Sequence, residues 1–537
     1  MDISEDKNET LRKKIPKKIC KMDLDTPDKG NSSDAYSKNI FLLAFEICKE
    51  KNKYRVYPTT SNLENKNGKL KHVHLVLDRI GYENTGVGTP WDLLWSHDYP
   101  FGELYSSLQG LQSHQKVNHF PGTGYITRKV DFASTDSKYI PRAFQLPQNT
   151  KEFIKYAENN KKSLFLEKHI RHRGVCLKNV SEIDTTSGNR FVQEYVQKPF
   201  LVDGHKFDIG VYVVLTSVNP LRVYWYKGDV LFRYCPAKYY PFDPRNLDKY
   251  VIADDYLPTW QVPSLAHPYT ALGFGMKQAF DVYVRSKGKD PSHMWEEVLS
   301  AITDVFSKKE HHIVEALKRF RSTENFFEMM RFDLIVDEDL KVYLLEANMS
   351  PNLSSDHYPP NQLLYEQVLY NLFSITGVRN QGSCFKDMSQ ILLKNKLKWI
   401  LPIFMPTRHI RKFACIRIFI VKKYITSCGS AQSAAQDMVS SLKNIAVFGS
   451  ECSTICKDDC EAADICKLCK TCLDAKMKSS LLKAHKEFLH RGDFRRLIPP
   501  SMDTNSLKKN LKRLTPNNKL QYLWYQGKCN EDITWCT

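Results

Sequence analysis

The chain has 537 residues, which is too long for one ordinary core and predicts about two to four subdomains. Hydrophobic residues make up 42% of it, a share that excludes a wholly disordered protein. The formal net charge of +18 predicts a basic surface, which suits an acidic partner such as nucleic acid, an anionic membrane or an acidic protein tail. Charge alone does not choose among these partners.

The beginning of the chain shows no secretory signal, because residues 1–21 are hydrophilic and the first apolar run, at 40–47, is short. A longer apolar stretch at 399–420 is interrupted by arginine and lysine, which are costly at the centre of a bilayer. We therefore expect no membrane span in this chain and a cytoplasmic protein. The alternative location is the lumen of the secretory pathway, if an N-terminal anchor is missing from this chain.

Composition and periodicity divide the chain into five regions. In chain order we expect a disordered lead at 1–38, an N-terminal α/β subdomain at 39–135, a central core at 136–375, a Lys/Ser/Cys-rich insertion at 380–475, and a basic helix with a tail at 476–537. Within the N-terminal subdomain, alternating apolar residues at 72–78 predict a strand. The central core carries all the candidate chemistry.

The central core mixes predicted strands with predicted helices. Strands are predicted for the apolar runs at 163–168, 190–196 and 207–216. Two turn signals, at 227–229 and 337–340, each lie between short apolar runs and predict antiparallel hairpins. Residues 294–306 repeat at the helical period. Antiparallel strand pairs combined with helices predict an α+β fold.

Asp333, Glu346 and Asn348 form the strongest candidate site. Asp333 lies early in one strand of the second hairpin and Glu346 ends the other, so antiparallel pairing brings their carboxylates together. Asn348 adds an amide oxygen on the same side, two residues further on. Three hard oxygen donors suit Mg²⁺ held between protein and nucleotide phosphates. The simpler interpretation, solvated acids at strand ends, is disfavoured because Glu346 directly follows an apolar run.

Cysteines concentrate late in the chain. Six of the fifteen lie between Cys452 and Cys472, and Cys529 and Cys536 follow near the end. Eight is an even number, which suits disulfides in an oxidising compartment. The spacing of Cys466, Cys469 and Cys472 also allows a zinc site, and free thiols are a third interpretation. In each case we expect the cluster to lie on the insertion, outside the catalytic core.

Several segments, in their order along the chain, resemble the tubulin–tyrosine ligase-like family of ATP-grasp enzymes. The hairpin at 332–351 is similar to the metal-binding hairpin of that family, and residues 192–208 resemble its nucleotide hinge and the following strand. The segments 118–124 and 140–147 resemble those that lead into its core, and 488–499 resembles its closing segment. The resemblance implies an α+β fold with an ATP-grasp ligase core, accompanied here by the N-terminal α/β subdomain and the Cys-rich insertion.

The resemblance also implies which residues hold ATP. The nucleotide-binding positions are Lys168, Arg173, Gly174, Gln193, Glu194, Tyr195, Val196, Lys206, Phe207 and Asp208. Lys206 and Arg233 are the implied catalytic residues, and Arg233 matches the family arginine that grips the carboxylate of the free amino acid. Lys206 and Asp208 lie two residues apart on a predicted strand, so their side chains share one face.

The implied activity is that of an ATP-dependent ligase, with Mg²⁺ as cofactor, that joins glutamate to a protein acceptor through an amide bond. The acidic tails of tubulin are the expected acceptor, which places the protein on the microtubule cytoskeleton, and no nucleic-acid motif is found. Three departures from the family pattern bear on the activity. The family's His-Leu-Thr-Asn segment is not found, and residues 267–276 are the comparable stretch. Gly210 stands where the strand after the hinge usually carries arginine, and Arg331 stands where glycine usually precedes Phe-Asp. They leave an alternative, a weak or inactive relative that binds ATP and microtubules.

Overall fold

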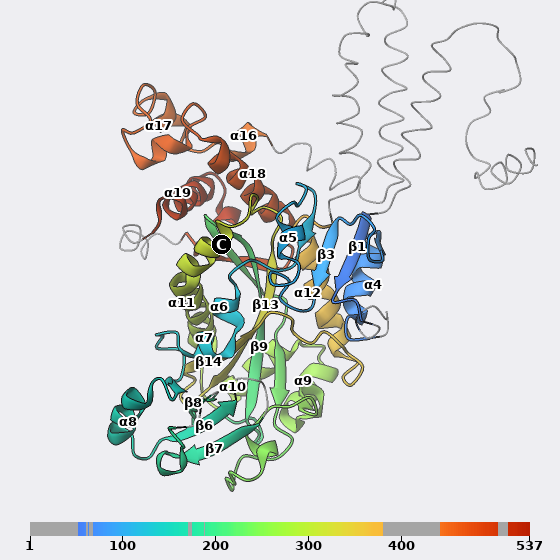
Figure 1. The fold of residues 1–537 in the computed structure, drawn as a ribbon, viewed down its shortest axis with the longest axis vertical. Coiled ribbons are helices and arrows are strands. Elements are labelled where there is room, and N and C mark those ends of the chain that lie inside the picture. Colours follow the sequence, from blue (N-terminus) through green and yellow to red (C-terminus); the bar gives the residue numbers. More distant parts are fainter. Residues whose placement is uncertain are drawn as a thin grey trace, which may run out of the picture.

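The computed structural model describes residues 52–60, 63, 68–169, 174–186, 188, 190–379, 441–502 and 514–537. The expected lead at 1–38 and the apolar stretch at 399–420 lie outside the described residues. None of the described helices is both long enough and apolar enough to cross a membrane. Three sheets, with helices packed around them, make up the described part (Figure 1).

A four-stranded parallel sheet lies in the N-terminal region. Its order is β2–β1–β3–β4, with the bounds Tyr82–Asn84, Asn52–Tyr57, Leu93–Ser96 and Lys116–Val117. Every pairing in it is parallel. Helices α4 (Lys71–Arg79) and α12 (Asn361–Ile375) pack against each other beside this sheet. The sheet is therefore completed by a helix that follows the central core in sequence.

The predicted strand at 72–78 is wrong, because these residues form α4. The alternation that suggested a strand depends on two histidines, and both are buried. The Nε2 atom of His72 lies 2.8 Å from Ser355 Oγ, and the Nδ1 atom of His74 lies 2.6 Å from Tyr54 Oη. Buried, hydrogen-bonded histidines widen the inward face of the helix, whereas the pattern had counted them as solvent-facing.

A second, antiparallel sheet forms the small lobe, residues 141–196. Its order is β5–β8–β6–β7, with the bounds Ala143–Leu146, Arg190–Glu194, Leu164–His169 and Val175–Asn179. Helix α8 (Thr150–Asn159) covers this sheet and closes a small core around Phe144, Phe153 and Phe165. The lobe has its own core, separate from the main one.

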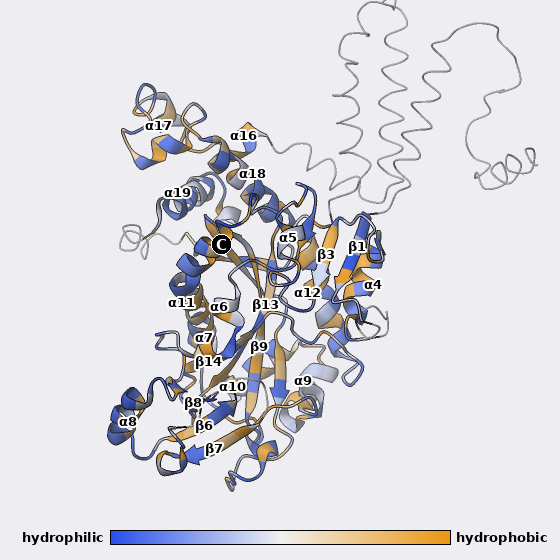
Figure 2. Cartoon of the chain, viewed as in Figure 1, coloured by the Kyte–Doolittle hydropathy of each residue, from blue (hydrophilic) through white to orange (hydrophobic). Residues whose placement is uncertain are grey.

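The largest sheet is built around β9. Its strands are β12 (Leu257–Pro258), β11 (Leu231–Tyr234), β9 (Phe207–Val218), β10 (Leu221–Tyr226), β15 (Phe494–Ile498), β13 (Glu328–Val336) and β14 (Val342–Asn348). Almost every residue of β9 and β13 is buried, and Figure 2 shows hydrophobic residues concentrated on these central strands. The predicted hairpin at 337–340 is confirmed, because β13 and β14 pair antiparallel.

Helices and short turns surround this sheet. They are α5 (Tyr105–Leu108), α6 (Gly124–Thr127), α7 (Lys129–Ala133), α9 (Pro263–Thr270), α10 (Met276–Ser286) and α11 (Ser292–Leu317). Helix α11 contacts β14 and β9, and it contains the helix predicted at 294–306. Strands and helices thus alternate irregularly, which confirms the α+β class.

The hairpin predicted at 227–229 is wrong. Both β10 and β11 pair antiparallel with β9, at different points along it, so they run in the same direction and not back to back. The loop between them has another task, because the carboxylate of Asp229 accepts hydrogen bonds from the backbone nitrogens of Met276 and Lys277 (2.8 and 2.9 Å). Asp229 thereby caps the N-terminus of α10. The Lys-Gly-Asp sequence at 227–229 is typical of a tight turn, but here its aspartate serves as a helix cap for a distant part of the chain.

The end of the chain forms a folded C-terminal module, residues 441–502 and 514–537. Its helices are α16 (Leu442–Ile445), α17 (Gly449–Ser453), α18 (Ala475–His490) and α19 (Pro516–Glu531). They enclose a second core that includes Leu481, Trp524 and Trp535. Four disulfides staple it: Cys452–Cys469, Cys456–Cys466, Cys460–Cys472 and Cys529–Cys536. Of the three interpretations of the cysteines, the structure therefore supports disulfides.

Helix α18 is tied into the main sheet by a buried carboxylate. Glu487 accepts hydrogen bonds from Arg222 Nε (2.8 Å), Tyr224 Oη (2.9 Å) and Thr216 Oγ1 (3.1 Å), and all four residues are buried. Lys483 on the same helix donates its Nζ to the backbone oxygen of Thr216. The stretch that we expected as a basic surface helix therefore directs part of its charge inwards.

Candidate active site

The candidate residues gather on one face of the largest sheet, where it meets the small lobe. Asp208 on β9 pairs in register with Arg233 on β11, and Asp333 on β13 pairs with Glu346 on β14. Because side chains two apart on a strand share a face, Lys206 and Asn348 belong to the same surface. The sheet thus brings together residues that are up to 142 positions apart, from 206 to 348.

The hairpin places the three candidate metal ligands at one end. Asp333 and Glu346 are direct cross-strand partners, and Asn348 lies opposite Arg331. The register shifts between Asp333 and Leu334, which gives β14 one extra residue at this point. Such a bulge bends a strand and redirects its side chains, and it is common beside active sites.

Asp333 is buried and enclosed by guanidinium groups. Its Oδ1 accepts from Arg331 Nε (2.7 Å), and its Oδ2 accepts from Arg331 Nη2 (2.8 Å), Arg233 Nη2 (3.0 Å) and Asn348 Nδ2 (2.9 Å). Burial alone would raise the pKa of Asp333, but Arg331 and Arg233 outweigh it and hold the pKa below its ordinary value. Asp333 therefore keeps its negative charge inside the protein.

Arg233 bridges two carboxylates. Its Nε and Nη2 donate to Asp208 (2.9 and 2.6 Å), and Nη2 also reaches Asp333. Burial raises the pKa of Asp208, against the opposing effect of Arg233, so the two carboxylates that share this guanidinium are driven apart in acidity. Within the described residues, Nη1 of Arg233 is the part of this fork that none of these bonds uses.

The donor set fits Mg²⁺ only in part. Glu346 is half-exposed, and Asn348 uses its Nδ2 towards Asp333, which leaves the amide oxygen of Asn348 for a cation. Asp333 Oδ2 already has three donors, so only Oδ1 has capacity left. Among the described residues, no group of three His, Cys, Asp or Glu is placed to hold a metal ion. A bound Mg²⁺ would therefore rest mainly on Glu346 and Asn348, with phosphate oxygens completing its shell.

Lys168 on β6 faces this surface from the small lobe. Its Nζ donates to the Oε1 of Gln193 on β8 (2.8 Å). Desolvation lowers the pKa of Lys168 from 10.5 to about 8, although Glu346 opposes the shift and two further lysines, Lys129 and Lys206, reinforce it. A desolvated ammonium between the two sheets is suited to a phosphate, whose negative charge would raise the pKa of Lys168 again.

The remaining hinge residues have mixed surroundings. The Glu194 carboxylate accepts from Tyr156 Oη (2.7 Å) and Ser163 Oγ (2.8 Å), which ties α8 to the sheet. Tyr195 is buried, and its Oη donates to Tyr239 Oη. Val196 follows β8 and lies outside the strand ladder. The Glu194 carboxylate is thus occupied by Tyr156 and Ser163.

Lys206 and its neighbours line the floor between the lobes. Lys206 is buried, donates its Nζ to the backbone oxygen of Tyr250 (2.7 Å), and lies over the Tyr195 ring at 5.5 Å. Burial lowers its pKa. Phe207 points to the opposite face, where it packs on Phe280. Gly174 is exposed with a φ of +75°, a left-handed conformation that favours glycine, while Arg173 lies outside the described residues.

Sequence reasoning missed Lys129, and it left Arg331 without a role. Helix α7 brings Lys129 Nζ to 3.6 Å from Glu346 Oε2. Nothing in the sequence around residue 129 marks it, because the contact depends on how α7 packs against β14. Arg331 was noted only as a departure, but its register opposite Asn348, two residues before Asp333, placed it on the face of the site.

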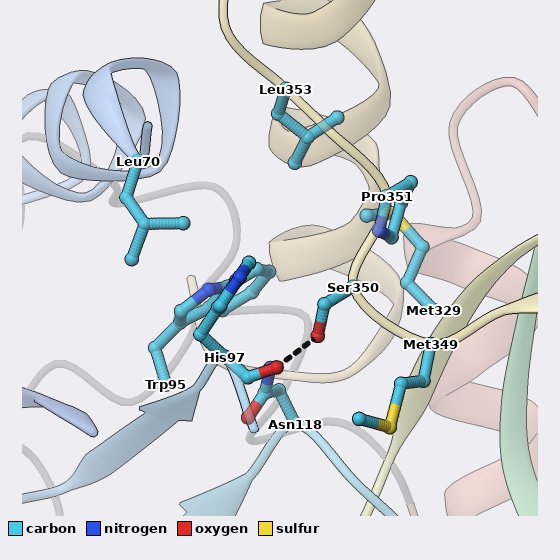
Figure 3. Close-up of a pocket in the computed structure, with 9 residues that line it drawn as sticks. All are labelled: Leu70, Trp95, His97, Asn118, Met329, Met349, Ser350, Pro351 and Leu353. Carbon is cyan, nitrogen blue, oxygen red and sulfur yellow. Dashed lines mark hydrogen bonds between the residues drawn. The ribbon is translucent and has the colours of Figure 1, made fainter. Parts of the chain in front are cut away.

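A separate pocket lies just beyond the end of β14. Met349, Ser350 and Pro351 form one wall, and Trp95 and His97 contribute to the other (Figure 3). Ser350 Oγ donates to the backbone oxygen of His97 (2.5 Å), as Figure 3 shows. Its lining is mainly apolar and includes none of the candidate nucleotide or metal residues. The pocket adjoins the metal hairpin without forming part of it.

Comparisons with known proteins identify relatives of this chain. The model of the tubulin-tyrosine ligase family matches residues 107–384. The probable tubulin polyglutamylase ttll-15 of Caenorhabditis elegans is 33% identical over 91% of this chain and 88% of its own length. The human tubulin monoglutamylase TTLL4 is 28% identical over 50% of this chain, and the mouse tubulin polyglutamylase TTLL6 is 26% identical over 64%. These matches span only 24% and 43% of those two longer relatives. The chain belongs to the tubulin–tyrosine ligase family.

Proposed function

We propose that this protein is an ATP-dependent ligase that joins glutamate to an acidic protein tail, with tubulin as the acceptor. The observation that carries the proposal is the convergence of Lys168, Arg233, Glu346 and Asn348 between two lobes of the fold. The similarity to proteins named tubulin glutamylases supports glutamate and tubulin. Family membership supports ATP and Mg²⁺ as the cosubstrate and cofactor.

The reaction needs two group-transfer steps, a phosphoryl transfer and an acyl transfer, and no protein nucleophile. The acceptor carboxylate attacks the γ-phosphorus of ATP, which forms an acyl phosphate and releases ADP. The amine of glutamate then attacks the acyl carbon, and inorganic phosphate leaves as the amide forms. Both steps develop negative charge on oxygen, so preorganised cations lower the barrier.

Each candidate residue has a place in this scheme. Lys168 and Lys206 balance charge on the phosphates, and Glu346 and Asn348 would hold Mg²⁺, which neutralises the transferred phosphoryl group. The free Nη1 edge of Arg233 is positioned to bind the carboxylate of the incoming amino acid, while its other nitrogens stay on Asp208 and Asp333. Gly174, with its left-handed backbone, would let main-chain amides approach the phosphates.

The departures at Gly210 and Arg331 motivate the alternative of an inactive relative that binds ATP and microtubules. One observation supports activity: Arg331 donates to both oxygens of Asp333, so a guanidinium lies in the site although position 210 is glycine. Binding of an acidic acceptor also needs exposed basic residues on the protein. In the C-terminal module, Lys478 and Arg495 are half-exposed, whereas Arg496 is buried and donates to backbone oxygens. The basic residues of this module that an acidic acceptor could contact are therefore fewer than its composition suggests.

The four disulfides bear on where the protein works. Disulfides persist in oxidising compartments and are rare in the cytosol. They are the observation behind the alternative location, in which the same ligase chemistry acts on an acidic tail other than tubulin in the secretory pathway. The tubulin-modifying relatives support the cytoplasmic microtubule location, which is the one that goes with tubulin as the acceptor. Thiol labelling of the protein taken from its native cells under denaturing conditions separates the two. Protection of the eight cysteines that form these four disulfides supports the lumen, and labelling of all eight supports the cytoplasm.

A direct test measures ADP release with tubulin as acceptor and each amino acid in turn. We expect release only when Mg²⁺, acceptor and glutamate are all present. ATP binding without acceptor-dependent ADP release, under conditions where a known glutamylase turns over, would establish the inactive alternative.

A further inference from the structure

Position 210 lacks a side chain at the centre of the site. Gly210 is the direct cross-strand partner of Asp333 on one side and of Leu231 on the other. A Cβ built on Gly210 would lie 2.8 Å from Cδ and 3.1 Å from Nε of Arg331. Contacts under 3.0 Å require a shift, so the space over Gly210 belongs to the Arg331 side chain.

The missing side chain also lets Arg233 cross the sheet. Arg233 is on β11 and Asp333 is on β13, with β9 between them, so their backbones are about 10 Å apart. The Arg233 side chain nevertheless reaches Asp333 Oδ2 at 3.0 Å. A large side chain at 210 would stand between them, because 210 neighbours both 233 and 333 on this face. Two guanidinium groups, one from the same strand as Asp333 and one from the strand beyond β9, thus meet one carboxylate beside a glycine.

We infer that Gly210 and Arg331 are a matched pair, in which Arg331 positions Asp333, and through it Arg233, for the carboxylate of the incoming amino acid. The guanidinium that occupies the space over Gly210 comes from Arg331 on β13. Arg331 is itself buried and bidentate on Asp333, so it acts through its neighbours and has no surface for substrate. The inference rests on the proposed ligase function for its substrate.

Removing the Arg331 side chain should disturb the positions of Asp333 and Arg233. Asp333 would lose two of its four hydrogen bonds and would draw Arg233 inwards, away from the substrate. Losing a supporting partner of this kind costs about 10-fold to 100-fold in function. The effect should fall on the KM for glutamate, whereas the Kd for Mg-ATP, which depends on Lys168 and Glu346, should change less than about threefold.

A double-mutant cycle tests the matched pair in the full chain. The variants are Arg331→Gly, Gly210→Arg, the two combined, and Arg331→Lys, which keeps the charge but loses the fork. We expect Arg331→Gly to raise the KM for glutamate at least about tenfold, Gly210→Arg to be worse in both KM and melting temperature, and the double variant to recover most of both losses. Arg331→Lys should fall between the wild type and Arg331→Gly.

Two results overturn the inference: a KM for glutamate that Arg331→Gly or Arg331→Lys leaves unchanged, or a double variant whose losses are the sum of the single ones. If Arg331→Gly fails to fold, the KM of Arg331→Lys decides. If the wild type transfers no amino acid at all, the proposed function fails. The coupling in melting temperature then decides between matched and independent residues, since Gly210→Arg should destabilise the wild type but not the Arg331→Gly background.

Discussion

The pKa of Lys168 leads to a prediction about the pH dependence of ATP binding. Desolvation lowers that pKa from 10.5 to about 8 in the free protein. Phosphates favour the ammonium form, so binding raises the pKa again and takes up a proton at high pH. The affinity for ATP should therefore be highest well below pH 8 and should fall as the pH rises through about 8.

The magnitude follows from the fraction of Lys168 that is charged. With a pKa of about 8, about nine-tenths of the side chains carry a charge at pH 7 and about one-tenth at pH 9. If only the charged form binds, ATP affinity falls about tenfold between these values, which is about 1.4 kcal/mol. The loss stops where the pH passes the raised pKa of the complex.

Calorimetric titration with Mg-ATP at pH 7, 8 and 9 measures this directly. Lys168→Arg is the informative variant, because a guanidinium stays charged throughout the range and should make the affinity nearly independent of pH. Lys162→Arg, at an exposed lysine of the same lobe, is the matched control and should keep the wild-type slope. If Lys168→Arg shows the same fall as the wild type, another group, such as Lys206, titrates, and the assignment of Lys168 to the phosphates is wrong.

Three further outcomes follow from the same contacts. Glu346→Gln should weaken Mg-ATP binding at least about tenfold by calorimetry with an unchanged melting temperature, since it removes one metal charge from a half-exposed side chain. Glu487→Ala should lower the free energy of unfolding by about 3–5 kcal/mol, because it leaves Arg222 buried and unpaired, while Glu531→Gln, at an exposed ion pair, should change it by less than about 1 kcal/mol. Replacing Cys456 and Cys466 by serine should cost about 3 kcal/mol in the C-terminal module and leave ATP affinity intact; a loss of ATP binding in the folded variant would contradict the separation of module and site.

The hairpin with Asp333 and Glu346 was predictable because its register depends on local pattern. Short apolar runs on both sides of a polar turn indicate the pairing within a short stretch of sequence. The same reasoning failed at Asp229, where turn-forming residues cap α10 from another part of the chain. Local patterns determine local pairing, but they do not show which distant element uses a polar group.

The network around Asp333 could not be read from the sequence. That Arg331 and Gly210 share one space depends on the diagonal contact of two strands whose pairing bridges more than a hundred residues. Taken one position at a time, Gly210 looks like a missing arginine and Arg331 looks like an arginine in the place of a glycine. Likewise, the inward direction of Lys483 and Glu487 depends on α18 packing against the sheet, and basic composition alone suggested an exposed face. Tertiary contacts determine whether a charged side chain points into the protein or to solvent, and composition gives only the number of charges.

Mass spectrometry of the acceptor tests the central claim most directly. Tubulin is incubated with the protein, Mg-ATP and glutamate, and its tails are compared with those from the Glu346→Gln variant. The account predicts glutamate-sized mass increments on acidic tail residues with the wild type, and none with the variant or without ATP. Unmodified tails with a wild type that binds Mg-ATP, on tubulin that a known glutamylase modifies, would contradict it.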